Sequence, residues 1–182
     1  MPMKHSNIEI KAKSENHGEI RDILKWLNAD FKGIDNQIDT YFNVPFGRLK
    51  LREGNIENHL IQYSRTDGKG PKQSDILLYK STSKSSLKEI LVKSLGILVV
   101  VDKQREIYFI DNVKFHIDKV KDLGDFVEIE AIDKTPSIGR DRLLKQCNLY
   151  MNLFKISQGD LIAVSYSDLL LQKKENSHTR NT

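Results

Sequence analysis

The sequence has few of the features that mark a secreted or membrane-bound protein. It contains one cysteine, which excludes an internal disulfide and suits a reducing cytoplasm. No apolar run approaches the roughly 20 residues that a membrane helix needs, and the first residues lack an apolar signal region. The longest apolar run, Gly96 to Val101, is short and β-branched, so it predicts a strand. We therefore expect a cytoplasmic protein that does not bind a membrane.

Aromatic residues are also scarce, at 8% of the sequence, and they form no platform of the kind that stacks RNA bases. The net charge is +4 and the isoelectric point is about 9.0, which permits nucleic acid, an anionic membrane or a phosphate compound as a ligand. The basic residues are spread among predicted strands instead of lying on one amphipathic helix. We therefore favour a small polyanion over nucleic acid.

No internal repeat or linker divides the chain, so we expect one domain over residues 1–182. Its core should span about residues 6–171, and the polar tail 172–182 should be disordered. Hydrophobic periodicity predicts helices at 19–29, 83–94 and 138–150. It predicts strands at 7–13, 36–43, 47–53, 58–65 and 74–81, and further strands between 96 and 131.

The strand predicted after Gly47 carries three cations on one face. Successive side chains of a strand point to opposite faces, so Arg48, Lys50 and Arg52 share a face. Like charges in neighbouring positions repel unless an anion or water lies among them. The pattern fits either a binding face or a solvated edge strand that is protected by charge from aggregation.

Other predicted strands carry charges at the same two-residue spacing, and some of these pairs are acidic. Solvated faces usually mix the two signs. If the polar faces converge, they form a lumen in which cations hold phosphate oxygens and carboxylates hold hard divalent metals. Ordinary solvated faces remain the alternative at this point. The pairs are Glu9 and Lys11, Lys103 and Arg105, His116 and Asp118, and Glu128 and Glu130.

These motifs, in this order, resemble the CYTH family, also called triphosphate tunnel metalloenzymes, which includes class IV adenylyl cyclases and thiamine triphosphatases. The family's first strand reads Glu-x-Glu-x-Lys, and here Asn7 replaces the first Glu. The resemblance covers about residues 7–171. The matching segments are Asn7 to Lys11, Asp39 to Phe42, Gly47 to Glu53, Lys103 to Arg105, Asp118, Leu123 to Glu130 and, for the cyclase-like branch, Ser165 to Leu170.

The resemblance implies an α+β fold, in which an antiparallel β-barrel with flanking helices forms a tunnel that binds a triphosphate with Mg²⁺ or Mn²⁺. The implied substrate-binding residues are Lys11, Arg48, Lys50, Arg52, Arg65, Lys103 and Arg105. The implied metal ligands are Glu9, Asp118, Glu128 and Glu130. The implied catalytic residues are Lys11, Arg105 and Glu130. Lys13 is a secondary candidate, and we expect Lys69 and Lys72 to be solvated.

The cyclase-like motifs favour an enzyme that converts ATP to cyclic AMP and pyrophosphate. The alternatives are an inorganic or thiamine triphosphatase, and a non-catalytic protein that binds polyphosphate or nucleotide. Asn7 keeps the last alternative open, because an amide oxygen can ligate a hard cation but supplies no charge. The expected partner is the triphosphate, with no nucleic acid and no membrane. Whether the protein forms a homodimer is left open.

Overall fold

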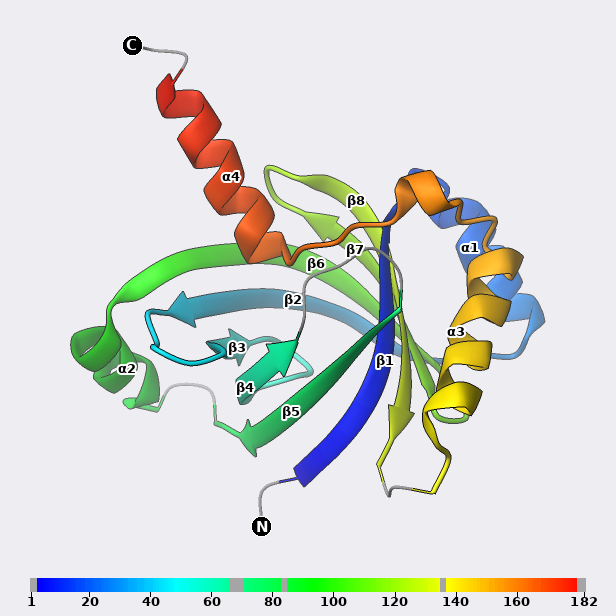
Figure 1. The fold of residues 1–182 in the computed structure, drawn as a ribbon, viewed down its shortest axis with the longest axis horizontal. Helices are drawn as coiled ribbons and strands as arrows, with labels where there is room; N and C mark the ends of the chain where they lie inside the picture. The colour runs from blue at the N-terminus through cyan, green and yellow to red at the C-terminus, as the bar shows by residue number, and fades with distance from the viewer. Residues whose placement is uncertain (1–2, 66–70, 83–84, 135–136, 180–182) are drawn as a thin grey trace.

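The computed structural model describes residues 3–65, 71–82, 85–134 and 137–179, and within them eight antiparallel strands close into a barrel. The order around the barrel is β1-β5-β4-β3-β2-β6-β7-β8 (Figure 1). The strands are β1 (Met3–Lys13), β2 (Asp30–Phe42), β3 (Arg48–Glu53), β4 (His59–Arg65), β5 (Lys72–Lys80), β6 (Ile97–Ile110), β7 (Val113–Val120) and β8 (Gly124–Asp133). The predicted α+β barrel with flanking helices is confirmed.

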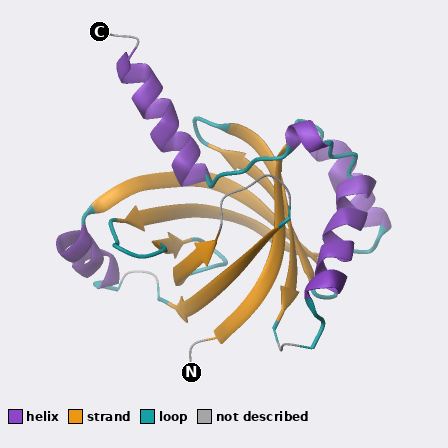
Figure 2. Ribbon diagram, viewed as in Figure 1, coloured by secondary structure: helices purple, strands orange, loops and turns teal. Residues whose placement is uncertain are grey.

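The helices lie outside the barrel (Figures 1 and 2). α1 and α3 lie along one side, α2 lies at the opposite side, and α4 projects away from the strands. No helix of the described ranges is both long and apolar enough to span a membrane. The helices are α1 (His17–Trp26), α2 (Leu87–Leu95), α3 (Arg140–Leu153), the short 3₁₀ helix η1 (Gln158–Asp160) and α4 (Tyr166–Thr179).

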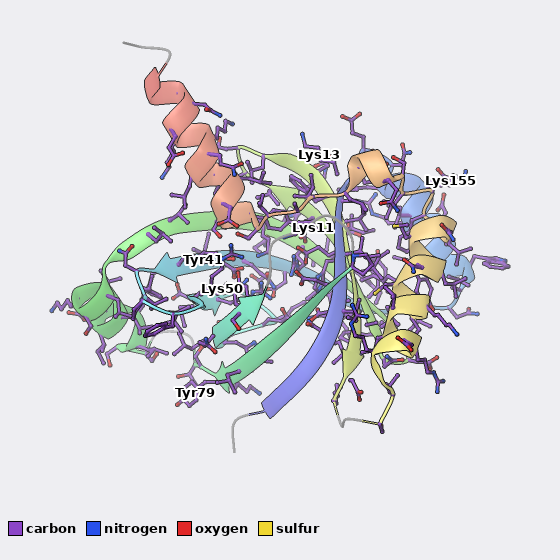
Figure 3. All side chains as sticks on the ribbon, viewed as in Figure 1. Lys11, Lys13, Tyr41, Lys50, Tyr79 and Lys155 are labelled. Carbon is purple, nitrogen blue, oxygen red and sulfur yellow. The ribbon has the colours of Figure 1, made fainter. Side chains whose placement is uncertain are left out.

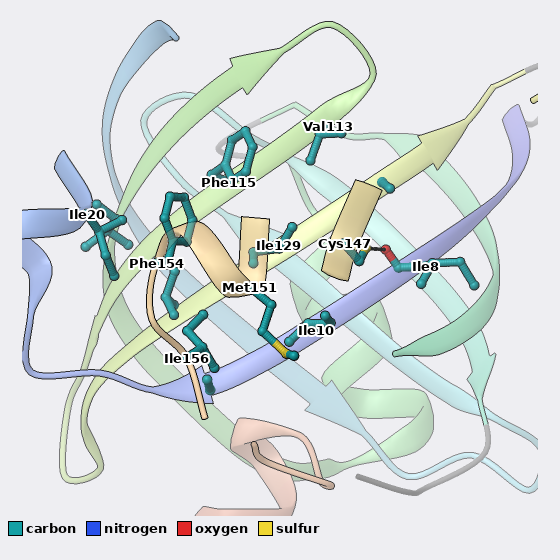
Figure 4. Packing of buried hydrophobic residues seen from close by; sticks show 14 of the residues in the cluster. Ile8, Ile10, Ile20, Val113, Phe115, Ile129, Cys147, Met151, Phe154 and Ile156 are labelled. Carbon is teal, nitrogen blue, oxygen red and sulfur yellow. Dashed lines mark hydrogen bonds between the residues drawn. The ribbon is translucent and has the colours of Figure 1, made fainter. Parts of the chain in front are cut away.

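The main hydrophobic core lies between the barrel wall and helices α1 and α3 (Figure 4). Alternate residues of β1, such as Ile8 and Ile10, point out of the barrel and pack against α3. Cys147 of α3 belongs to this core, and its thiol lies 3.2 Å from the Ile8 carbonyl oxygen. Because one face of β1, β7 and β8 is held by this core, the polar residues between must face the lumen.

Two chain ends differ from the sequence-based expectation. β1 begins at Met3 instead of residue 7, and α4 continues to Thr179 through most of the segment predicted to be disordered. Reciprocal bonds between Ser165 and Asp168 cap the start of α4, and the Lys173 ammonium reaches the Asp122 carbonyl at 2.5 Å. Once a helix is nucleated, residues of good helix propensity extend it without a buried face, so the polar composition misled the prediction.

Candidate functional site

The barrel encloses a cavity of about 570 Å³, within the range typical of small-molecule sites. Its polar wall includes side chains that strand alternation predicted to share faces, so these polar faces do converge. Figure 3 shows Lys11 and Lys50 within the ring of strands, whereas Lys13 lies outside it. The predicted site residues that line the cavity are Glu9, Lys11, Lys50, Arg52, Lys103, Arg105, Glu128 and Glu130.

Three of the remaining predicted residues are described by the structure, and they do not border the cavity. Arg48 forms an ion pair with Asp168 of α4 at 2.9 Å, and it does not border the cavity. Asp118 is fully buried behind Arg105, and Lys13 is exposed. The side chains of Arg65, Lys69 and Lys72 fall outside the described part of the structure. These placements result from barrel closure, which strand alternation alone does not specify.

Asp39 of β2 is shared by three of the cavity cations. Its carboxylate accepts two hydrogen bonds from Arg52, at 2.8 and 2.9 Å. The ammonium of Lys50 lies 2.9 Å away and that of Lys103 2.7 Å away. Burial alone would raise the pKa of Asp39, but Arg52, Lys103 and Lys50 together hold it well below its usual value. Sequence reasoning noticed Asp39 only as part of a motif and assigned it no role.

At Lys103, in contrast to Asp39, burial outweighs the attraction of the oppositely charged neighbour and sets the direction of the pKa shift. Burial lowers the pKa of its ammonium to about 7, and the neighbouring charges of Arg52 and Arg105 add to this effect against the attraction of Asp39. Lys103 therefore changes charge near neutral pH in the folded protein.

Arg105 of β6 is held by the buried carboxylate of Asp118 and the partly buried carboxylate of Glu128. Its guanidinium donates to both oxygens of Asp118, at 2.7 and 2.5 Å, and to Glu128 at 2.8 Å. The Tyr166 hydroxyl donates to Asp118 at 2.8 Å, and Lys11 pairs with Glu128 at 3.2 Å. Burial opposes the ionised form of both acids, but Arg105 keeps the pKa of Asp118 and of Glu128 below their usual values. Two of the four predicted metal ligands thus already bind a guanidinium.

Residues to which the sequence analysis assigned no role complete the polar wall. Lys114 of β7 pairs with Glu57, which also accepts from Arg52 at 2.9 Å. The Nδ1 atom of His116 lies 3.0 Å from Glu128. Burial, with Arg105 and Lys114, lowers the pKa of His116 to about 3, so the ring is neutral and Nδ1 donates to the carboxylate. Lys114 and His116 share a strand face, and that parity was their only sequence signal.

The carboxylates of Glu9 and Glu130 fit a hard cation. They are register partners on β1 and β8, and both border the cavity. Like charges in this position repel, and burial raises the pKa of Glu130 further. Asn7 lies on the same strand face by its two-residue spacing from Glu9. Its Nδ2 donates to Glu130, while its buried Oδ1 has no hydrogen-bond partner within the described ranges.

In the described residues, no three acidic, histidine or cysteine side chains form a ready-made metal cage. Mg²⁺ is commonly held by one or two carboxylates with substrate phosphates, so such a cage is not needed for the fit. Glu9 and Glu130 supply oxygen donors of the required kind, and the Asn7 oxygen lies on the same strand face.

Comparisons with known proteins agree with this barrel. The model of the CYTH domain matches residues 5–161. A protein of Methanocaldococcus jannaschii named "Putative adenylate cyclase MJ0240" is 28% identical over 177 residues, covering 89% of this chain and 97% of that protein. The structure of the PH1012 protein from Pyrococcus horikoshii is 25% identical with a TM-score of 0.76, covering 90% of this chain and 98% of that one.

A plant protein shares the fold at lower identity. The structure of the Hippeastrum protein HpAC1, described as a "putative adenylyl cyclase" with a dominant triphosphatase activity, has a TM-score of 0.59 and is 13% identical. The match covers 94% of this chain and 96% of the Hippeastrum chain. With a family match over residues 5–161 and a polar-lined antiparallel barrel, this chain belongs to the CYTH domain family.

Proposed function

We propose that this protein is a metal-dependent enzyme acting on a triphosphate, and that it converts ATP to cyclic AMP and pyrophosphate. One observation carries the proposal: lysine and arginine side chains from four strands line a single cavity. Arg forms paired hydrogen bonds to phosphate oxygens and Lys supplies a compact charge, so the set suits a chain of phosphates. The cations are Lys11, Lys50, Arg52, Lys103, Arg105 and Lys114.

Phosphoryl transfer depends mainly on alignment and charge neutralisation, which this wall can supply without a covalent nucleophile. Lys50 and Lys103 share Asp39 with Arg52, so phosphate oxygens can engage their remaining hydrogens. Lys11 and Arg105 are the proposed catalytic cations, and Asp118 orients Arg105. Arg65 remains a proposed phosphate contact on the family resemblance, and Arg48 could join it only by leaving Asp168, since it does not border the cavity.

The proposed cofactor is Mg²⁺ or Mn²⁺, held by Glu9 and Glu130 with Glu128 beside them. When bound, the ion would neutralise phosphate charge and orient phosphate oxygens. Glu130 is the proposed catalytic carboxylate, because it borders the cavity and would hold the ion there.

In the cyclase reaction, the ribose 3′-oxygen bonds to the α-phosphorus, the bond from that phosphorus to the bridging oxygen breaks, and pyrophosphate leaves. The hydroxyl proton is lost to solvent. The name of the Methanocaldococcus relative supports this choice. In a triphosphatase, water attacks the terminal phosphorus instead, and the activity given for the Hippeastrum protein makes this the second candidate.

Product analysis separates the candidates. Purified protein is incubated with ATP, tripolyphosphate or thiamine triphosphate and Mg²⁺ or Mn²⁺, and products are resolved by chromatography. We expect cyclic AMP and pyrophosphate in equal amounts from ATP. Phosphate release without cyclic AMP would establish a triphosphatase, and binding without turnover would establish the non-catalytic alternative.

The Lys11→Met variant is expected to lower kcat/KM by roughly 100-fold or more, because it removes a charge from a buried site where charge stabilises the transition state. The exposed Lys119 of β7 gives the control, since its side chain lies on the outer face. Lys119→Met should keep the wild-type rate. Equal rates for Lys11→Met and wild type would remove Lys11 from the proposed machinery.

Binding of tripolyphosphate at about pH 8 is expected to take up protons through Lys103. The pKa of this ammonium is about 7 in the free protein, so Lys103 is mostly neutral at that pH, and a bound polyanion favours its charged form. Isothermal titration in buffers with different ionisation enthalpies measures the uptake. Lys103→Met should abolish most of it, and an unchanged proton count in that variant would contradict the assignment.

A further inference from the structure

The segment that leads into α4 supplies a side chain to the cavity wall. Figure 1 shows the chain between η1 and α4 crossing β1, where Ala12 and Leu161 form an antiparallel bridge. The amide of Ile162 donates to the carbonyl oxygen of Lys11 at 2.9 Å. Tyr166, the first residue of α4, lines the cavity. The wall is therefore completed by a part of the chain that lies outside the barrel strands.

Polar contacts hold the first turn of α4 against the barrel. The carboxylate of Asp168 accepts hydrogen bonds from the amide and the hydroxyl of Ser165, at 2.9 and 2.6 Å. The same carboxylate pairs with Arg48 of β3 at 2.9 Å. Because this turn is tied to β3, the side chain of Tyr166 enters the wall at a fixed place, and it is only 4% exposed.

The ring of Tyr166 lies close to two ammonium groups of the cavity. The Nζ atom of Lys11 is 4.0 Å from the ring centroid, and that of Lys103 is 6.0 Å from it. The face of an aromatic ring attracts a cation within about 6 Å, and the attraction is stronger where water is excluded. The Phe126 ring packs on Tyr166 with 4.9 Å between centroids. The core thus holds the ring, and the ring restrains the ammonium of Lys11.

The hydroxyl of Tyr166 reaches the second proposed catalytic cation through a carboxylate. It donates to Oδ2 of Asp118 at 2.8 Å, and Arg105 donates to the same oxygen at 2.5 Å. Asp118 is fully buried, so its carboxylate cannot turn toward water when one of these bonds is lost. One tyrosine therefore contacts Lys11 directly and also contacts the group that orients Arg105.

The strands by themselves restrain Lys11 less well. Among the described residues, its ammonium pairs with Glu128 at 3.2 Å, and Arg105 binds the same carboxylate. Lysine carries its charge on a flexible four-carbon stem, so a single ion pair does not set its direction. A small displacement of a catalytic group can lower a rate strongly. A tyrosine that served only to fill the core would not need to face an ammonium group.

We propose that Tyr166 is a positioning residue for the transfer step, whose ring sets the ammonium of Lys11 and whose hydroxyl, through Asp118, sets the guanidinium of Arg105. This inference rests on the proposed function, because it takes Lys11 and Arg105 as the catalytic cations. It adds that the segment before α4 is a working part of the site.

The test is a mutant cycle at residues 166 and 11, measured as steady-state turnover of ATP and of tripolyphosphate, each with Mg²⁺. Tyr166→Phe keeps the ring and loses the hydroxyl, whereas Tyr166→Leu loses both. We expect kcat to fall about threefold for Tyr166→Phe and about 30-fold for Tyr166→Leu, with KM within about twofold of wild type, because the other cations still bind the phosphates. In the Lys11→Met background, Tyr166→Phe and Tyr166→Leu should differ by less than about twofold, since the ring acts through an ammonium that is absent.

Tyr108→Phe is the matched control. The hydroxyl of Tyr108 also donates to a carboxylate, that of Glu106 at 2.9 Å, but Tyr108 does not border the cavity. This variant should keep the wild-type kcat. Circular dichroism checks that each variant folds, and Tyr166→Met, which fills the space with a flexible apolar side chain, replaces Tyr166→Leu if that variant does not fold.

The outcomes separate this inference from the proposed function. If Tyr166→Leu keeps the wild-type kcat, the inference is wrong although the triphosphate function stands. The same conclusion follows if Tyr166→Phe and Tyr166→Leu differ as much in the Lys11→Met background as without it, because the ring then supports the fold and does not act through Lys11. If wild type turns over neither triphosphate, the proposed function falls and this inference falls with it.

Discussion

Replacing Arg105 by methionine is expected to lower the free energy of unfolding by about 3–5 kcal/mol, the usual cost of leaving buried charges without their partner. Arg105 holds Asp118 and Glu128, both inside the barrel wall, through three hydrogen bonds of 2.5–2.8 Å. Urea denaturation at pH 7 measures the loss. Arg105→Lys should cost less, because it keeps the charge but not the paired geometry.

The loss of unfolding free energy in Arg105→Met should depend on pH in a definite direction. In wild type, the pKa values of Asp118 and Glu128 lie below their unfolded values, so both acids contribute stability above about pH 4.5 that is lost as the pH falls. Without Arg105, the two carboxylates favour protonation. The difference in unfolding free energy between wild type and Arg105→Met should therefore shrink between pH 7 and about pH 4.

The control for Arg105 is Arg21→Met. Arg21 also forms a bidentate pair, with Glu106, but its side chain is 39% exposed. Solvent weakens such a pair, so the expected loss is at most about 1 kcal/mol. If Arg105→Met and Arg21→Met lose the same free energy of unfolding, burial does not explain how strongly Arg105 stabilises the fold.

The second large effect is expected for Asp39→Asn. This change removes the one carboxylate that Arg52, Lys50 and Lys103 share, and leaves buried cations close together. We expect the free energy of unfolding to fall by about 3–5 kcal/mol. An added polyanion can replace the lost charge, so tripolyphosphate should raise the melting temperature of Asp39→Asn more than that of wild type.

Asp102→Asn is the matched control for Asp39. Asp102 lies on the outer face of β6, where its exposed carboxylate is 3.9 Å from Lys121. Its loss should change stability by no more than about 0.5 kcal/mol and leave the response to tripolyphosphate unaltered. If tripolyphosphate stabilises Asp39→Asn no more than wild type, the cations around Asp39 do not hold phosphate.

Much of the site could be predicted because strand alternation is a local property. The two-residue spacing placed Lys50 with Arg52, and Glu128 with Glu130, on single faces, and the structure turns those faces into one cavity. The same spacing put Asp118 on the face of His116, but it did not show that Asp118 lies fully buried behind Arg105 and away from the cavity surface. Strand parity predicts the face on which a side chain lies, but it does not predict how deeply that side chain is buried.

The sequence by itself determined which side of each strand is polar, because apolar residues such as Ile8 and Ile10 must be buried against α3. Only the tertiary structure decided which charges meet. Asp39 and Lys103 are 64 residues apart, and they pair because barrel closure sets the register of β2 against β6. Register between distant strands depends on the packing of the whole barrel, so no local pattern contains it.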